Sequence, residues 1–285
     1  MIAGLGRDLR TRRFWRSFAL HAFAFGGFVA ALLQVYDLFQ PDAISESALP
    51  LPLVVAALAI AYAVARSWPR PVEQQYSRPS TQIRVVVGDL FDQDANLVIG
   101  MATTFDTAVP HVISKRSVQG QFLERIYSSD TAALDAALAE ALAATEPTGS
   151  VEKDGKSATY PVGTIAVIRQ NRKHYFCAAY TEMDEQNVAH GSVPGVWRSL
   201  ENLWDEVRAR SNGDPIAMPV IGGGQARMSH VLPAQDSIRL IALSFILASR
   251  DSRVCERLDI VVREGDVPAL DMLELQAFLT SLQES

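Results

Sequence analysis

Three consecutive glycines, Gly222, Gly223 and Gly224, form the part of the sequence best suited to binding an anion. They end a short apolar run over 216–221, which predicts a buried strand. Glycines leave backbone N–H groups accessible and let a ligand approach the main chain closely. A phosphate suits such a turn because its oxygens can accept several N–H groups at once. The alternative interpretation is a flexible turn between a strand and a helix.

A second stretch far upstream favours the functional interpretation. The β-branched, apolar run 83–87 predicts another buried strand, and it stops at Gly88, Asp89 and Leu90. The chain therefore has two strands that each end in a turn with groups able to bind a polar ligand.

Other chemistries find no support in the residue patterns. Cys177 and Cys255 have no metal-ligand spacing, and the five histidines show no paired spacing. The chain has no Walker-type loop, no dinucleotide-binding glycine pattern after the first strand and no Ser-His-Asp or Cys-His motif. We therefore expect no metal, no cofactor and no catalytic residues. Two isolated cysteines favour a reducing compartment.

The charge distribution argues against a nucleic-acid partner. Residues 1–80 contain 8 Lys and Arg against 5 Asp and Glu, whereas the remainder contains 18 against 27. A soluble part with a net charge of −9 lacks the basic face that binding to a polyphosphate backbone requires. It could still bind one anionic nucleotide through local N–H donors.

Two uncharged segments near the N-terminus predict a transmembrane helical hairpin over 1–66, with spans over about 17–36 and 48–65. Arginines flank both outer ends, and the short connection is acidic, so both termini are expected in the cytoplasm. A buried hairpin in a soluble protein and a cleaved signal peptide are the alternatives. The proline-containing segment 67–80 predicts a semi-extended linker.

The segment 81–285 alternates between strand and helix patterns. Strands are expected over 83–87, 96–100, 163–169, 173–180, 216–221 and 258–263, and helices over 118–127, 131–144, 194–210, 234–249 and 267–282. Thr131 is the expected N-cap of the second helix. The pattern predicts an α/β fold, with helices covering a sheet.

The strand followed by Gly88-Asp89-Leu90 and the late strand with Pro219, Ile221 and the glycine triplet together resemble a macrodomain, the ADP-ribose-binding module. The resemblance implies a three-layer α/β/α mixed sheet. It places the Asp89 carboxylate and the Leu90 backbone at the adenine, since a carboxylate accepts from an exocyclic amino group, and Gly222, Gly223 and Gly224 at the diphosphate. The usual asparagine of macrodomain hydrolases has no counterpart in 101–107, which implies a binding protein rather than an enzyme.

Two N-terminal spans joined to a macrodomain with Phe-Asp-Thr and Ser-x-Gln-Gly sequences resemble the membrane-bound effectors of bacterial Thoeris anti-phage defence. The resemblance implies an inner-membrane sensor of an ADP-ribose-derived messenger, plausibly histidine–ADP-ribose, made by a TIR-domain enzyme. Binding would drive homo-oligomerisation, disruption of the lipid bilayer and abortive infection. The alternative function is a membrane-tethered ADP-ribosyl hydrolase.

The same resemblance extends the expected ligand site beyond the diphosphate. The residues that would line this part are Phe105, Asp106, Thr107, Ser117, Gln119 and Gly120. Each of them could instead serve to pack its loop. Arg227 could pair with a phosphate, and Tyr180, at a strand end, could stack on the ligand.

Overall fold

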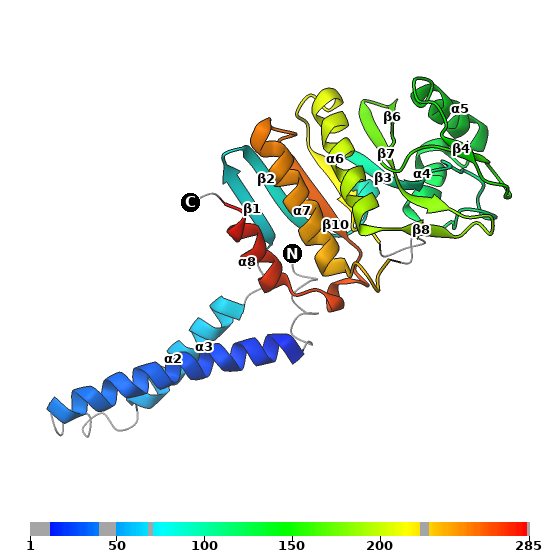
Figure 1. Ribbon diagram of the computed structural model, residues 1–285. Helices are drawn as coiled ribbons and strands as arrows, with labels where there is room; N and C mark the ends of the chain where they lie inside the picture. Colours follow the sequence, from blue (N-terminus) through cyan, green and yellow to red (C-terminus); the bar gives the residue numbers. More distant parts are fainter. Residues whose placement is uncertain (1–11, 40–49, 68–70, 223–227, 284–285) are drawn as a thin grey trace. The chain divides into compact units, whose positions relative to one another are not determined.

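The computed structural model of the chain describes residues 12–39, 50–67, 71–222 and 228–283 (Figure 1). The chain divides into two compact units, Met1–Arg70 and Pro71–Ser285. Each unit is described by itself below.

The N-terminal unit contains two helices, α2 (Arg12–Phe39) and α3 (Pro50–Ser67). They pack against each other through Phe25 and Tyr62, whose rings stack with centroids 4.9 Å apart. Large apolar side chains project outward from α2, including Phe23, which is 82% exposed. Such a surface suits an apolar environment better than water.

Among the described residues, one helical segment, Phe18–Val35, is long and apolar enough to cross a membrane. The apolar stretch in the second helix, Leu53–Ala63, is shorter. The hairpin of two spans therefore stays a prediction, and one apolar helix near the N-terminus is weak evidence of a membrane location.

The C-terminal unit is built on a mixed sheet with the strand order β1-β2-β10-β9-β3-β7-β6. The strand β8 pairs with the C-terminal end of β7. The neighbours from β2 to β7 in this order run parallel, whereas β1, β6 and β8 are antiparallel to their partners. The strands are β1 (Val72–Ser77), β2 (Ser80–Val87), β3 (Asn96–Ala102), β6 (Ile165–Gln170), β7 (Lys173–Met183), β8 (Ala189–Gly191), β9 (Ile216–Pro219) and β10 (Arg257–Val262), with β4 (Gly149–Ser150) and β5 (Ala158–Thr159) forming a separate pair.

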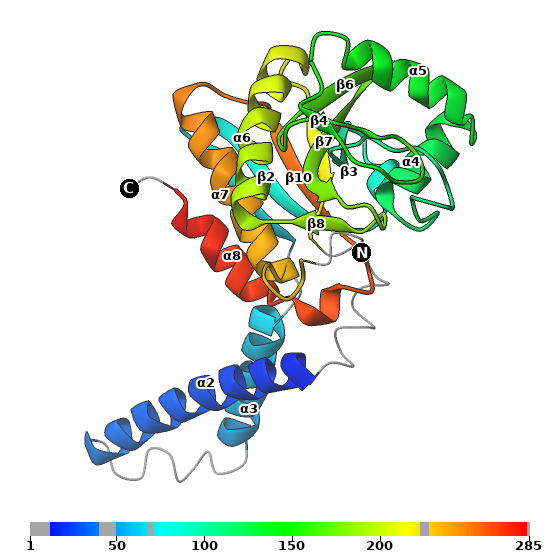
Figure 2. The ribbon, with the colours of Figure 1, turned by 45° about the vertical axis from the view of Figure 1, so that its right-hand side comes forward.

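Helices cover both faces of this sheet. The helices α6 (Val193–Arg210), α7 (Ala234–Asp251) and α8 (Met272–Ser281) lie along one face (Figures 1 and 2). The helices α4 (Val118–Tyr127) and α5 (Thr131–Ala141) contact β3 and β6 from the other face. Two short 3-10 helices, η2 (Leu90–Asp92) and η3 (Val267–Ala269), follow β2 and β10.

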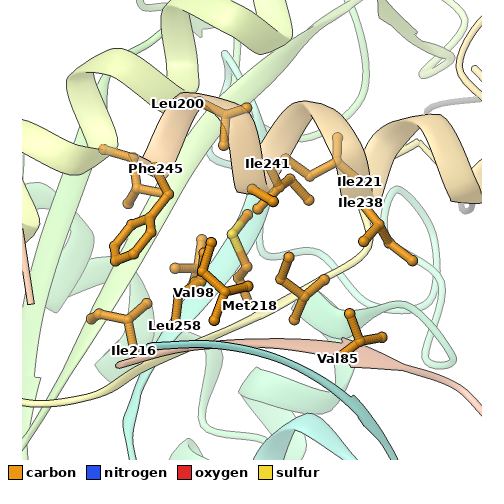
Figure 3. Packing of buried hydrophobic residues seen from close by; sticks show 14 of the residues in the cluster. Val85, Val98, Leu200, Ile216, Met218, Ile221, Ile238, Ile241, Phe245 and Leu258 are labelled. Atoms are coloured by element: carbon orange, nitrogen blue, oxygen red, sulfur yellow. The ribbon is translucent and has the colours of Figure 1, made fainter. Parts of the chain in front are cut away.

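Alternating side chains of the central strands divide the interior into two cores. Val98 and Met218 belong to the core under α6 and α7, where they meet Leu200 and Phe245 (Figure 3). Leu97, on the opposite face of β3, belongs to the core under α4 and α5. This alternation is the expected consequence of the two-residue period of a strand. The predicted α/β fold with a mixed sheet is confirmed.

The strands expected over 163–169 and 173–180 form a hairpin, since β6 and β7 pair antiparallel from Gln170 and Lys173. Its two loop residues, Asn171 and Arg172, have φ angles of 50° and 71°. Positive φ at both loop positions matches the turn type whose twist suits a two-residue hairpin.

Three sequence-based expectations were wrong in detail. Residues 71–80 are not a linker, because β1 and the start of β2 occupy them and β1 forms the edge of the sheet. Asp130 rather than Thr131 caps α5, since its carboxylate accepts the N–H of Ala133. The helix expected over 267–282 is divided into η3 and α8, with Asp271 capping α8.

Candidate functional site

A cavity of about 500 Å³ lies at the carboxyl ends of the parallel strands β3, β7, β9 and β10, on the face that α6 and α7 cover. A cavity of this volume is large enough for a small-molecule ligand. The carboxyl ends of parallel strands are also where open α/β sheets bind ligands. The residues that build it come from the strand ends, the loops that follow them, the start of α4 and the inner face of α6.

Tyr180 and Gly100 shape the part of the cavity next to β3 and β7. A Cβ atom on Gly100 would lie 2.5 Å from the Tyr180 ring, so the ring can lie against β3 only because residue 100 is glycine. Burial raises the pKa of Tyr180 to about 12. The phenol is therefore neutral at physiological pH, and it can donate a hydrogen bond or contact a ligand with its ring.

The glycine turn borders the cavity through Gly222. Its φ angle of +91° lies in a region that side chains disfavour, and an added Cβ would lie 3.3 Å from the Cβ of Met228. Glycine at this position thus permits the abrupt turn that follows β9. Gly223, Gly224 and Arg227 lie outside the described residues.

The start of α4 contributes Ser117 and Gln119 to the cavity lining. The Ser117 hydroxyl caps the helix by accepting the N–H of Gly120 at 3.0 Å, and it donates to the carbonyl of Ser114 at 2.6 Å. Gly120 does not line the cavity. Its role is packing, because a Cβ there would collide with the Ser114 carbonyl oxygen.

The loop after β3 was expected to line the cavity, but Phe105, Asp106 and Thr107 are not among its lining residues. Phe105 is buried in the core under α4, edge-on to Tyr160. Thr107 donates to the carboxylate of Asp135 at 2.6 Å. These side chains serve packing and internal hydrogen bonds.

Asp106 is the most heavily bonded residue of this loop. Its carboxylate pairs with the Nζ of Lys153 at 2.7 Å, and both side chains are almost fully buried. It also accepts the hydroxyl of Thr104 at 2.6 Å and the backbone N–H of Lys156 at 2.7 Å. Gln119 donates its side-chain amide to the Asp106 carbonyl. Asp106 therefore positions Gln119 in the cavity wall and has no direct place in the cavity.

Asp89 lies just after β2, beyond the lining residues of the cavity. One carboxylate oxygen accepts the N–H of Phe91 at 2.9 Å, and the other pairs with the guanidinium of Arg125 at 2.8 Å. Each carboxylate oxygen can accept two hydrogen bonds, so Asp89 keeps capacity for a further donor. The Leu90 side chain is buried in the core, which leaves only its backbone for a ligand.

Two charged lining residues follow β10 and were not singled out from the sequence, Arg263 and Asp266. Arg263 is the only Lys or Arg among the described lining residues, and its exposed side chain can reach an anion. Its place at the end of the predicted strand 258–263 was a usable signal. Asn187, in the loop between β7 and β8, also lines the cavity, and no pattern in the sequence marks it.

The described cavity offers hydrogen bonding, apolar contact and two charged side chains of opposite sign, Arg263 and Asp266. No group of three or more His, Cys, Asp or Glu in the described part of the chain is arranged to hold a metal. Both cysteines are buried, and burial raises the pKa of each thiol, that of Cys255 to about 12. Neither is therefore an activated nucleophile.

A three-layer unit with a mixed sheet and a cavity at this edge agrees with the macrodomain fold. The solved Oceanobacillus iheyensis macrodomain with ADP has the same fold, with a TM-score of 0.50 and 12% sequence identity, covering 75% of this chain and 99% of that one. A mutant of that macrodomain with ADPR gives a TM-score of 0.50 and 12% identity, covering 73% and 99%.

Residues 83–263 match the sequence model of the family described as Thoeris protein ThsA, Macro domain. The chain belongs to this family. No curated protein matches it.

Proposed function

We propose that this protein is a membrane-bound sensor of Thoeris anti-phage defence, whose macrodomain binds an ADP-ribose derivative without consuming it. The observation that carries the proposal is the cavity of about 500 Å³ at the strand ends, bordered by the Gly222 turn and by Arg263. A left-handed glycine and a guanidinium suit a diphosphate, since both supply donors to its oxygens. Membership of the ThsA macro domain family and the solved macrodomains with ADP and ADPR add support.

The arrangement of the strand ends gives the ligand a direction. Asp89 follows β2, Arg263 follows β10, and the glycine turn follows β9, so these three groups lie in this order across the sheet. An adenine near Asp89, a diphosphate near the glycine turn and a terminal ribose near β3 and β7 would match this order. The ribose would then approach Tyr180, Ser117 and Gln119.

The proposed output is assembly of the N-terminal helices in the cytoplasmic membrane, with both termini inside the cell. The macrodomain carries an excess of acidic residues, and like charges oppose close packing of several copies. A ligand can shift such an equilibrium only by binding the assembled state more tightly than the dispersed one. The partner of the sensor would be a TIR-domain enzyme that supplies the messenger.

The test uses the full chain in lipid nanodiscs, titrated by calorimetry with ADP, ADP-ribose, NAD and histidine–ADP-ribose. We expect saturable binding of at least one ADP-ribose derivative and recovery of the ligand unchanged by chromatography. Turnover of a ligand would show that the protein is a hydrolase rather than a sensor. A lack of binding to every compound would remove the basis of the proposal.

A second measurement tests the output. The full chain in vesicles should release an entrapped dye only when the bound derivative is added. The double variant Phe23→Glu/Phe28→Glu changes two exposed apolar residues of α2 and should bind the ligand normally without releasing dye. If the variant released as much dye as wild-type protein, the apolar surface of α2 would not be the cause of the membrane damage.

A further inference from the structure

The two ends of the cavity differ in chemistry. The end near β10 contains the charged side chains of Arg263 and Asp266. The opposite end, next to β7 and β8, is lined by Ile113, Met183 and Ala189, which belong to a small apolar cluster. No Lys, Arg, Asp or Glu is among the described lining residues at this end. The cavity therefore offers a charged region for a diphosphate and an apolar region for another group.

The wall of the apolar end is the hairpin formed by β7 and β8. Asp184 holds its turn together, because its carboxylate accepts the N–H groups of Gln186 at 2.9 Å and Val188 at 2.8 Å. The other carboxylate oxygen lies 2.7 Å from the Nε2 of His190. These bonds fix the backbone of the turn, so the residues on its inner side are presented in one arrangement.

Asn187 occupies the position of this turn with a positive φ angle, 60°. It lines the cavity, and its side-chain carbonyl oxygen is buried with no hydrogen-bond donor among the described atoms. Asparagine tolerates this backbone conformation, which accounts for the residue type but not for the unused acceptor. A buried acceptor without a partner lowers stability, so a ligand that supplies a donor would gain free energy at this point.

We propose that the hairpin of β7 and β8 recognises the terminal group of the ligand, and that the Asn187 carboxamide accepts a hydrogen bond from it. This inference rests on the proposed function, and it deepens that function by naming the specificity-determining residue. The group that fits is largely apolar or planar, carries an N–H or O–H donor, and is attached to the ribose distal to adenosine. A ligand that ends at the diphosphate would not reach this wall.

The test compares ADP with NAD and histidine–ADP-ribose on the full chain in nanodiscs. Wild-type protein is expected to bind at least one of the two derivatives at least tenfold more tightly than ADP. The variant Asn187→Gly keeps the backbone conformation and deletes the carboxamide. It should weaken binding of that derivative by about 10- to 100-fold and change ADP binding by less than about twofold.

The matched control is Asn171→Gly, the same change at a positive-φ turn between β6 and β7, away from the cavity lining. It should leave every affinity unchanged. Wild-type binding of ADP and both derivatives with equal affinity would overturn the inference, as would equal losses for ADP and the derivative in Asn187→Gly. In either case ADP still binds, so the proposed function survives. Loss of all binding in wild-type protein would instead overturn both.

Discussion

Asp106 and Lys153 form a buried ion pair, with 2.7 Å between the carboxylate Oδ2 and the ammonium Nζ. Their side chains are 1% and 0% exposed, so neither charge is solvated by water. The pair joins the loop after β3 to the loop before β5, and the Asp106 carbonyl holds Gln119 of the cavity wall. One buried pair thus links the interior of the domain to its candidate ligand site.

The first prediction follows from this pair. Lys153→Met removes the ammonium and leaves a buried carboxylate without its countercharge, which costs about 3–5 kcal/mol of unfolding free energy. For a domain of this size we expect a midpoint of thermal unfolding lower by roughly 6–20 °C, measured by differential scanning calorimetry. Lys115→Met changes an exposed lysine and should shift the midpoint by no more than about 2 °C. Equal shifts would show that the pair contributes little.

The second prediction concerns Asp89 and adenine. Asp89→Ala should weaken binding of ADP-ribose by about 1.5–3 kcal/mol, the value of a hydrogen bond to a charged group, or roughly 10- to 150-fold in the dissociation constant. Arg125→Ala is the control, because it removes the partner of Asp89 but leaves the acceptor in place. It should change the affinity by less than about threefold. Calorimetric titration that finds Asp89→Ala unchanged would contradict the adenine assignment.

The third prediction concerns the glycine turn. Gly222→Ala places a side chain at a φ angle of +91° and brings its Cβ to 3.3 Å from the Cβ of Met228. The left-handed backbone costs about 1–2 kcal/mol, and the turn can shift to relieve it. We expect at least a tenfold weaker binding of ADP, since the N–H groups of the turn would be displaced. Gly265→Ala, where an added Cβ meets nothing within 4 Å, should bind ADP normally.

The central part of the fold could be predicted from the sequence because its strands are apolar on both faces. The strand β1 was missed because it has few buried residues. Only Val72 and Tyr76 of this edge strand are buried, and the prolines on either side favour the interpretation as a linker. An edge strand needs few apolar residues, so its pairing with β2 leaves a weak pattern.

The candidate site was predictable only where a local feature of the sequence marks it. A glycine turn after a strand is a local feature, and Gly222 does border the cavity. The role of Asp106 depends on residues far along the chain, because the Lys153 ammonium neutralises its carboxylate in the interior and the backbone N–H of Lys156 donates to it. The unpartnered acceptor of Asn187 is likewise a product of tertiary packing. Local sequence cannot distinguish a polar residue that faces a ligand from one whose bonds are all internal.

The fourth prediction is a loss of stability at high pH. Burial raises the pKa of Tyr127 from 10.0 to about 12 and that of Cys255 from 9.0 to about 12. The folded state holds these protons more tightly than the unfolded state. Their contribution to the free energy of unfolding is therefore complete below pH 9 and declines as pH rises toward 12. Urea unfolding at several pH values should show this decline.

Tyr127→Phe tests the contribution of one of these groups. Its hydroxyl is buried without a partner among the described atoms, so its removal should be neutral or slightly stabilising at pH 7. Between pH 10 and 12 the variant should lose stability less steeply than wild-type protein, because one group that releases its proton on unfolding is gone. If the free energy of unfolding fell with pH as steeply in the variant as in wild-type protein, Tyr127 would be solvated in the folded state.

The last prediction concerns Arg263, the only Lys or Arg among the described residues that line the cavity. Its side chain is exposed, so its attraction to a diphosphate is partly screened by solvent. Arg263→Gln should weaken ADP binding by about 5- to 20-fold at low ionic strength, and by less in 0.5 M salt, where the Debye length falls to about 4 Å. Arg169→Gln makes the same change in net charge on β6, outside the cavity lining, and should have little effect. Equal losses in both variants would indicate a general effect of net charge, whereas a loss confined to Arg263→Gln would identify the phosphate-binding cation of the site.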